Sequence, residues 1–323
     1  MYTDKPLNTP VLFLIFNRPE TTLRVFEMIR KARPSKLFVV ADGPRKDKPG
    51  EEDRCRLARE IIKGVNWDCE VYTNFRDENL GLKLAVSSGI TWFFENVEEG
   101  IILEDDCVPS LSFFWFCQEL LEKYRDDEQV MCVCGNNYQD GTQRGNSSYY
   151  FSRIVGIWGW ATWRRAWKHF DIELKNFPAF KKSKQIRNIF HDRIVKRFFM
   201  TKIQDAYHGG NTWGFAWVFT VLYHNGLCIT PNINLVSNCG FGPNSVHAID
   251  TNSKLSNIPS GEIEQIIHPV SVIPDNEADE YLTKVVASEQ MPKRNPMYYI
   301  KIFVRSIIGK RYYESLKRIA NNK

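Results

Sequence analysis

The chain has 323 residues, a formal net charge of +5, and 43% hydrophobic and 13% aromatic residues. This composition is that of a globular protein large enough for one big domain or two fused halves. No uninterrupted apolar stretch reaches the length of a membrane span, and residues 1–8 lack the basic and then apolar pattern of a signal peptide. These features argue against an integral membrane protein or a secreted one, and we expect a cytoplasmic protein.

The eight cysteines are scattered singly along the chain. The closest pair, Cys132 and Cys134, has no second pair at the spacing of a zinc site. We therefore expect reduced, buried thiols of the kind found in cytoplasmic proteins.

Positive charge is concentrated at the C-terminus, where residues 293–323 hold nine Lys/Arg and one Glu. Subtracting their +8 from the +5 of the whole chain leaves −3 for residues 1–292, which is not the pattern of a nucleic-acid-binding protein. Apolar residues recur at helical spacing among these basic ones. Such a basic amphipathic segment is typical of a helix on an anionic membrane surface, and also of a terminal helix packed on the protein body.

The first third of the chain alternates apolar runs with amphipathic segments. The predicted strands are 11–16, 36–41, 70–74 and 101–103, and the predicted helices are 21–32, 55–63 and 84–96, with a charged loop at 45–54. Continuous apolar runs are typical of parallel strands that are buried on both faces. The repeated strand-helix alternation predicts an α/β fold with a doubly wound, mostly parallel sheet flanked by helices.

The pattern is less regular after residue 110. We predict helices at 113–125 and 217–225, a basic helical region at 181–202, and strands at 130–135 and 227–230. Residues 136–150 have a polar, loop-like composition, and residues 157–167 are rich in tryptophan.

Three consecutive carboxylates, Glu104, Asp105 and Asp106, follow the apolar run 100–103 and precede residues 107–109. They therefore lie at the carboxyl end of a predicted buried strand, where open α/β sheets bind their ligands. Like charges so close together repel, and burying them is costly unless a positive charge compensates. A divalent cation bound to a diphosphate would do so, because hard cations prefer carboxylate and phosphate oxygens. The alternative is a solvated acidic turn.

Other polar residues follow the neighbouring strands. Asn17 and Arg18 come after the first predicted strand and Asp42 after the second, so all would face the same edge of the sheet. Asp42 has two equally supported interpretations: it accepts a hydrogen bond from a base or ribose, or it forms the turn before Gly43. Arg18 or Arg76 could bind phosphate.

Residues 76–83 lie just before a predicted helix. Their glycine and Lys83 suit a phosphate at a helix N-terminus, although an ordinary capped helix start has the same sequence. Trp158 and Gly159 begin a tryptophan-rich segment; aromatic rings stack on sugar faces, and glycine lets the backbone approach a ligand. The alternative for these tryptophans is core packing. His247 could supply a nitrogen ligand to a metal.

Taken together, these residues resemble nucleotide-sugar glycosyltransferases of the GT-A fold, in particular the N-acetylglucosaminyltransferase I-like group and its bacterial relatives. The resemblance covers roughly residues 10–250. The matching segments are residues 16–19, 41–43, 79–81, 103–106, 158–163 and 234–238.

The resemblance implies a role for each motif. Asp106 would bind Mn²⁺ or Mg²⁺, with Glu104 and Asp105 facing the sugar and ribose. Asp42 would recognise the nucleobase, and His247 would reach the metal. Asn17, Arg18, Arg76, Lys83, Trp158 and Gly159 are the remaining expected donor-binding residues.

The resemblance also implies a division of the chain. Residues 1–250 would form the GT-A domain, with a nucleotide-sugar-binding half at 10–110 and an acceptor-side half at 111–250. Residues 251–292 would be a C-terminal extension and residues 293–323 a basic tail.

One position departs from the family pattern. Relatives tend to carry an acidic residue beside the tryptophans that match Trp213 and Trp217, where it serves as general base, but residues 214–216 of this chain contain no carboxylate. A positioned base contributes about 10²–10⁴-fold to the rate. Asp205 and His208, a few residues upstream, are the candidate substitutes.

The expected function is a metal-dependent transfer of a sugar from a nucleotide donor, UDP-linked by expectation, to a glycan or lipid-linked acceptor in cell-surface polysaccharide synthesis, at the inner face of the membrane. Two alternatives remain open. A sugar-phosphate nucleotidyltransferase would prefer a glycine-rich, basic loop after the first strand, and residues 17–20 do not form one. A non-catalytic sugar-nucleotide-binding scaffold is the second.

Overall fold

The computed structural model describes residues 6–183, 185–241 and 253–290. The strands are β1 (Val11–Ile15), β2 (Lys36–Ala41), β3 (Glu70–Phe75), β4 (Glu99–Glu104), β5 (Cys107–Pro109), β6 (Val130–Cys134), β7 (Tyr149–Ser152), β8 (Trp160–Trp163), β9 (Leu227–Pro231) and β10 (Val236–Asn238). The helices are α1 (Pro19–Ala32), α2 (Glu51–Glu60), α3 (Gly81–Asn96), α4 (Leu111–Lys123), α5 (Arg164–Trp167), α6 (Phe177–Lys182), α7 (Gln185–Ile189), α8 (Arg193–Tyr207), α9 (Gly214–Tyr223) and α10 (Asn276–Gln290), with a 3₁₀ turn η2 (Ile61–Gly64).

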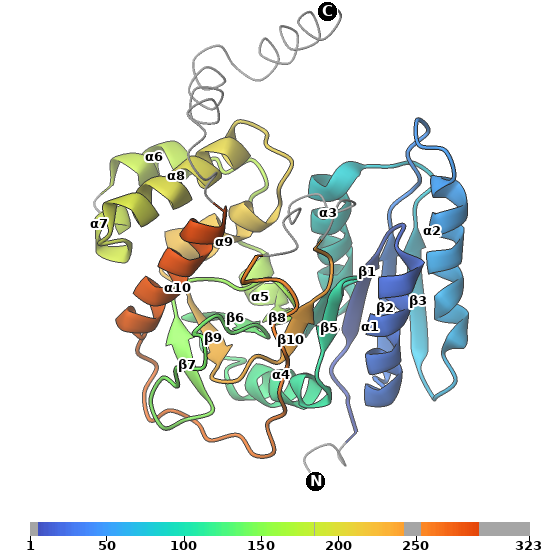
Figure 1. The fold of residues 1–323 in the computed structure, drawn as a ribbon, viewed down its shortest axis with the longest axis horizontal. Coiled ribbons are helices and arrows are strands. Elements are labelled where there is room, and N and C mark those ends of the chain that lie inside the picture. The colour runs from blue at the N-terminus through green and yellow to red at the C-terminus, as the bar shows by residue number, and fades with distance from the viewer. Residues whose placement is uncertain (1–5, 184, 242–252, 291–323) are drawn as a thin grey trace, which may run out of the picture.

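One eight-stranded sheet runs through the molecule in the order β3-β2-β1-β4-β8-β6-β9-β7 (Figure 1). Strands β3, β2, β1 and β4 are parallel, and β6 and β9 run in the same direction because β8 lies antiparallel between β4 and β6. Only β8 and β7 oppose that direction in the described sheet. The predicted α/β fold with a mostly parallel sheet flanked by helices is confirmed.

The central strands are buried on both faces, which explains their continuous apolar sequences. Along β1, Leu12 and Leu14 belong to one core cluster, and Val11, Phe13 and Ile15 belong to the other. This alternation follows from the two-residue repeat of a strand. Helices α3, α8 and α9 contribute to the first cluster, and α1 and α4 to the second.

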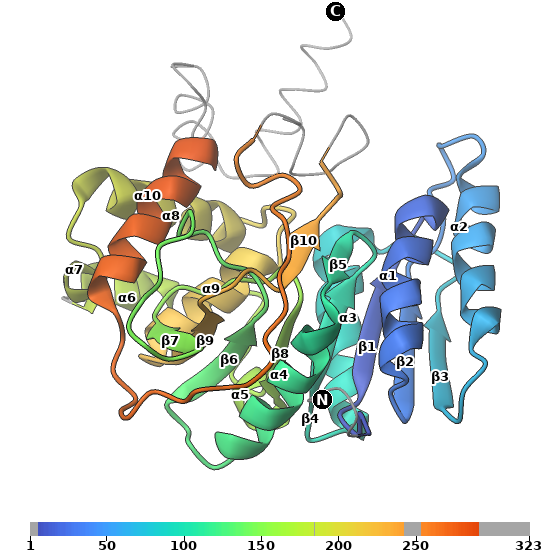
Figure 2. The same ribbon diagram turned by 60° about the horizontal axis from the view of Figure 1, so that its bottom comes forward.

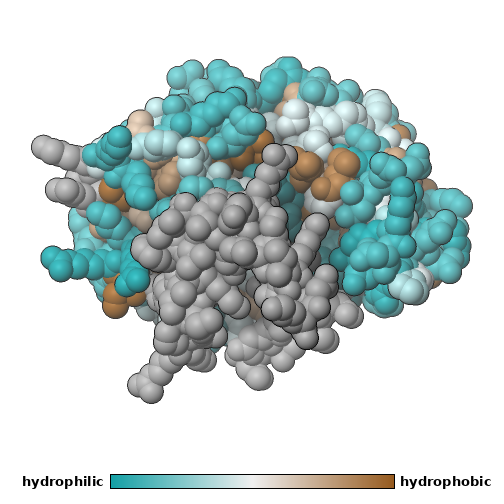
Figure 3. Space-filling model, turned by 90° about the horizontal axis from the view of Figure 1, so that it is seen from above, coloured by the Kyte–Doolittle hydropathy of each residue, from teal (hydrophilic) through white to brown (hydrophobic). Residues whose placement is uncertain are grey.

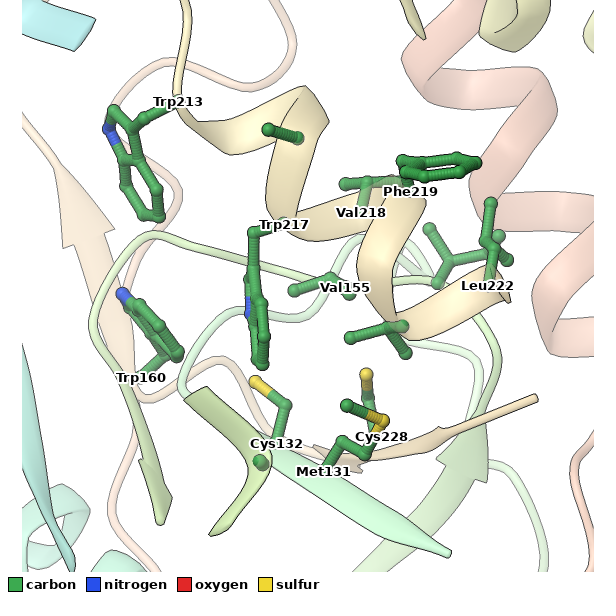
Figure 4. Close-up of a cluster of buried hydrophobic side chains, with 14 of the residues drawn as sticks. Met131, Cys132, Val155, Trp160, Trp213, Trp217, Val218, Phe219, Leu222 and Cys228 are labelled. Atoms are coloured by element: carbon green, nitrogen blue, oxygen red, sulfur yellow. The ribbon is translucent and has the colours of Figure 1, made fainter. Parts of the chain in front are cut away.

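The first core cluster contains most of the tryptophans of the second half of the chain. Trp160 stacks on Trp213 with ring centroids 5.9 Å apart, and Trp217 lies 5.2 Å from Trp167. Figure 4 shows Trp160, Trp213 and Trp217 between α9 and the strands. The core-packing alternative is therefore correct for Trp160, Trp163, Trp167 and Trp217, which are at most 5% exposed.

Several element predictions were wrong or incomplete, most of them in the second half of the chain. The tryptophan-rich segment contains strand β8 and helix α5, and β7 begins within the region expected to be a loop. The basic helical region divides into α6, α7 and α8, and α2 begins at Glu51 inside the predicted loop 45–54. These short elements escape detection because β7 and β8 have four residues each, too few to show a repeat.

The helices α6, α7 and α8 lie at the opposite end of the molecule from α2 and β3 in both views (Figures 1 and 2). The described sheet takes strands from both predicted halves, 10–110 and 111–250. The predicted tail 293–323 and its membrane role lie outside the described residues.

No helix in the described ranges has the length and apolar character needed to cross a bilayer. Seen from above, hydrophobic residues of the described surface form small groups among hydrophilic ones (Figure 3).

Helix α10 is fixed to the sheet through a buried carboxylate. Asp279 is 7% exposed, accepts hydrogen bonds from the hydroxyl of Ser152 and the backbone N–H of Arg153, and pairs with the Arg153 guanidinium at 3.5 Å. Burial raises the pKa of Asp279, and these donors partly offset that effect.

We predict that Asp279→Ala lowers the free energy of unfolding by about 1–3 kcal/mol, because it leaves the Arg153 N–H buried without its acceptor. Urea denaturation of the full chain measures the change. Glu277→Ala, on the same helix but with a 91% exposed side chain, is the control and should change stability by less than about 0.5 kcal/mol. Equal losses in the two variants would contradict the role given to Asp279.

Candidate active site at the ends of β1 and β4

The order of the strands in the sheet reverses between β1 and β4. The chain goes outward from β1 to β2 and β3, and then crosses back so that β4 pairs with the other side of β1. In open α/β sheets, ligands bind outside the carboxyl ends of the strands at such a switch point. Here those ends carry residues 16–18 after β1 and the acidic triplet at the end of β4.

The structure brings Arg18 into contact with the triplet. Its guanidinium pairs with Asp105 through one nitrogen and with Asp106 at 2.9 Å through the other. Asp105 also accepts a hydrogen bond from the backbone N–H of Phe16 at 3.3 Å. The side chain of Asp105 is 3% exposed and that of Asp106 15%, so Asp106 is the more accessible carboxylate.

The triplet carries more negative charge than its surroundings balance. Burial raises the pKa of Glu104 to about 8, with the neighbouring Asp106 and Asp105 adding to the effect. Burial also raises the pKa of Asp105 to about 6, although Arg18 opposes that shift. Burial alone would lower the pKa of Arg18, but the two aspartates outweigh it and raise the pKa. The single guanidinium of Arg18 is therefore the positive charge that stabilises all three carboxylates.

A second chain segment supports Asp106 from behind. The antiparallel pair β5 and β10 places Asn238 within 3.4 Å of the Asp106 carboxylate, and Cys239 donates its backbone N–H to the Asp106 carbonyl at 2.9 Å. A Cβ atom on Gly240 would lie 2.0 Å from Asp106 Oδ2, so only glycine allows the backbone this close. The sequence alone does not indicate that Asn238 and Gly240 are neighbours of Asp106, because only the pairing of β5 with β10 brings them together.

The carboxylate of Asp42 accepts hydrogen bonds from other groups of the protein. One carboxylate oxygen accepts the backbone N–H groups of Gly43 and Leu80, and the other accepts the N–H of Gly81 and the amide of Asn79, all at 3.0–3.1 Å. These bonds attach the end of β2 to the start of α3. The turn-forming interpretation of Asp42 thus describes its contacts, and the predicted contact with a base would compete with them.

Asn17 and Arg76 also make protein contacts. Asn17 donates a hydrogen bond from its side-chain amide to Glu51 at 2.8 Å. Hydrogen bonds from Arg45 and Asn17 lower the pKa of Glu51, although burial acts to raise it. Arg76 donates to the carbonyl of Ala85 and the hydroxyl of Ser88, both on α3. Among the described residues, neither side chain forms a hydrogen bond or ion pair with the acidic triplet.

Lys83 lies in the first turn of α3, where its backbone N–H donates to the side chain of Asn211 at 3.2 Å. This contact brings the loop after α8 against the start of α3. Asp205 lies in the last turns of α8, where its carbonyl accepts the N–H of Gly210, and His208 ends that helix. The roles proposed for Asp205 and His208 as base stay predictions, and His247 lies outside the described residues.

Trp158 and Gly159 lie beside the triplet's strand. Trp158 is partly buried and packs edge-on against Tyr138 and Phe241, each with centroids 5.6 Å away. Gly159 has φ = +62°, and a Cβ atom there would lie 2.7 Å from Val236 on β10 and 3.3 Å from Leu103 on β4. This glycine therefore lets the Trp158 loop pack between the strand that carries the triplet and the one that supports Asp106.

The donor set of the triplet suits a hard divalent cation, since carboxylate oxygens are what Mg²⁺ and Mn²⁺ prefer. The three carboxylates do not converge within 4.8 Å of one another in the described structure. A full protein cage is not needed, because Mg²⁺ is commonly held by one or two carboxylates together with substrate phosphates. Glu104, whose carboxylate has no hydrogen bond among the described residues, and Asp106 are the side chains that would hold it.

Comparisons with known proteins give a likeness in fold only. No family model matches the sequence, and no curated protein matches it. Similar solved structures include HddC from Yersinia pseudotuberculosis (10% identity, 49% of this chain and 77% of that chain, TM-score 0.31) and UDP-glucose pyrophosphorylase complexed with UDP-glucose (11%, 50% and 78%, 0.31). Mouse xyloside xylosyltransferase 1 is another (12%, 67% and 82%, 0.32). Such low values carry no information on what this site binds.

The raised pKa of Glu104 predicts a pH-dependent stability. Between its ordinary value of 4.5 and about 8, the folded protein holds a proton that the unfolded chain has released, so stability falls as the pH rises through this range. In chelator-treated protein, Glu104→Gln should therefore gain Tm relative to the unmodified chain as the pH goes from 5 to 8. Thermal denaturation across this range measures the difference.

The exposed Glu95 supplies the control, since Glu95→Gln should follow the unmodified protein at every pH. Parallel curves for Glu104→Gln and the unmodified protein would show that Glu104 titrates normally.

Proposed function

We propose that this protein is a metal-dependent glycosyltransferase that moves a sugar from a nucleoside-diphosphate donor to a glycan or lipid-linked glycan acceptor. The observation that carries the proposal is the uncompensated acidic triplet at the switch point between β1 and β4. A metal diphosphate would supply what this place lacks, which is further positive charge beside the carboxylates.

Each residue of the site has a defined part in this proposal. Glu104 and Asp106 would hold Mn²⁺ or Mg²⁺, and the ion would supply Lewis-acid stabilisation of the departing diphosphate. Arg18 fixes the orientation of Asp105 and Asp106 through its two ion pairs, and 27% of its side chain remains exposed. Asp105, nearly inaccessible, acts through its bonds to Arg18 and the Phe16 N–H.

The sugar of the donor would lie against the Trp158 loop. The partly buried ring of Trp158 lies between Tyr138 and Phe241 and offers an aromatic surface for a sugar face. The close packing of Gly159 on Val236 keeps this ring near the end of β4.

The connection from β1 to α1 supports the nucleotidyltransferase alternative less than the glycosyltransferase. The connection from β1 to α1 is only residues 16–18 and contains no glycine, so it has no phosphate-cradling loop of backbone N–H groups. The scaffold alternative rests on the absence of a carboxylate at residues 214–216.

Donor binding is the primary test. Thermal denaturation with UDP-, GDP-, CMP- and dTDP-sugars, each with and without Mn²⁺, should give a Tm increase that needs Mn²⁺ and one class of nucleotide. No increase with any donor would favour the scaffold alternative. An increase with a nucleoside triphosphate and sugar phosphate, together with pyrophosphate release, would favour the nucleotidyltransferase.

Asp106→Asn should remove the Mn²⁺-dependent Tm increase and lower kcat by about 10²–10³-fold, because charge stabilisation at the diphosphate is lost. The Tm without ligands should be almost unchanged, since Asp106 is partly accessible. Asp126→Asn, an exposed aspartate, is the matched control and should behave like the unmodified protein. Full turnover by Asp106→Asn would refute the metal assignment.

Asp205 and His208 are proposed as alternative general bases. If Asp205 is the base, Asp205→Asn should lower kcat by about 10²–10⁴-fold, and if His208 is the base, His208→Gln should do so. In either variant the donor-induced Tm increase should remain. Steady-state kinetics beside donor binding separates the two effects. Unchanged kcat in both variants would place the base elsewhere in the chain.

A further inference from the structure

Three cysteines from two neighbouring strands meet in the first core cluster. Cys132 and Cys134 lie two residues apart on β6, so their side chains share a face, and Cys228 on β9 is the direct register partner of Cys132. The three sulfur atoms all lie within 4.8 Å of one another. All three residues are at most 1% exposed.

Within the described part of the chain, this is the one group of three metal-ligating side chains whose donor atoms converge in this way. The Cys132 and Cys134 sulfurs are 3.8 Å apart. Sulfurs bound about 2.3 Å from a common zinc ion in tetrahedral geometry lie about 3.8 Å from each other. The thiols therefore already have a spacing that suits a shared cation.

The surroundings also suit sulfur in its charged form. The backbone N–H of Gly156 donates to the sulfur of Cys134 at 3.2 Å, a contact typical of groups that support metal-bound thiolates. Figure 4 shows the Cys132 sulfur directed toward Trp217, whose indole N–H is buried without a hydrogen-bond partner in the described structure.

We propose that Cys132, Cys134 and Cys228 form a structural binding site for a thiophilic cation, Zn²⁺ or Cu⁺. Thiolate ligands select these ions over Mg²⁺ and Mn²⁺, so the site is chemically separate from the acidic triplet. Each thiol that ligates releases its proton to solvent, and the ion replaces those protons. Because the thiols are buried, the ion enters as the chain folds, and its binding stabilises the contact between β6 and β9.

The test uses the full chain, unfolded with chelator and reductant and refolded with Zn²⁺, Cu⁺ or Co²⁺ under exclusion of oxygen. We expect about one ion per chain by elemental analysis, proton release on loading, and thiolate-to-cobalt charge-transfer absorption in the Co²⁺ form. The Zn²⁺ and Cu⁺ arms, refolded separately, identify which ion raises the Tm.

Cys134→Ala and Cys228→Ala should lose the bound ion and the charge-transfer absorption. Cys55→Ala is the matched control, since Cys55 is also buried but lies alone on α2, and it should retain both. Metal that stays bound in the cluster variants would overturn the proposal. If these variants do not fold, the unmodified protein decides: absence of cobalt-thiolate absorption after refolding would show that the thiols serve only as small apolar core residues.

Discussion

The positive charge of one arginine holds together the part of the molecule on which the proposed function depends. Arg18 begins α1, directly after the central strand β1, and its guanidinium reaches the carboxylates that follow β4. This contact is possible because β1 and β4 are hydrogen-bonded neighbours whose carboxyl ends lie at the same edge. A single cation does not balance three carboxyl groups, and burial together with the neighbouring Asp106 and Asp105 raises the pKa of Glu104. The carboxyl ends of β1 and β4 therefore have too little positive charge to balance the carboxylates there.

The parts of this arrangement that sequence could predict are the ones encoded locally. A run of apolar residues on β1, β2 or β4 can form only a strand buried on both faces, and the residue after it must lie at the sheet edge. The acidic triplet and Asn17, Arg18 and Asp42 were located by that argument alone. What Asp42 does there was not predictable, because its four donors come from residues 43 and 79–81 and depend on where α3 begins.

The remaining features depend on contacts between distant segments. The support of Asp106 by residues 238–240 arises from the pairing of β5 with β10, and these strands are too short to show a periodic pattern. Cys228 is separated from Cys132 by about 95 residues, so cysteine spacing alone indicated no metal site. The tryptophans posed the opposite difficulty, because aromatic residues suit a sugar platform and a core equally well. Burial decides between these roles: Trp160 and Trp217 are core residues, and Trp158 is only partly buried.

The structure also gives a reason why no carboxylate is found between Trp213 and Trp217. Gly214 and Ala216 are buried, and a side chain at Gly214 would meet Ile157 at 2.6 Å. Trp213 itself stacks on Trp160 inside the core, so a carboxylate at position 214 or 216 would be buried away from water. The middle position holds Phe215, which is partly buried and lies beside Lys202. The proposed general bases, Asp205 and His208, belong to the more polar segment before this helix. Residues 205–211 are that segment, and the bond from Lys83 to Asn211 holds it against the start of α3, the helix that Asp42 joins to the sheet edge.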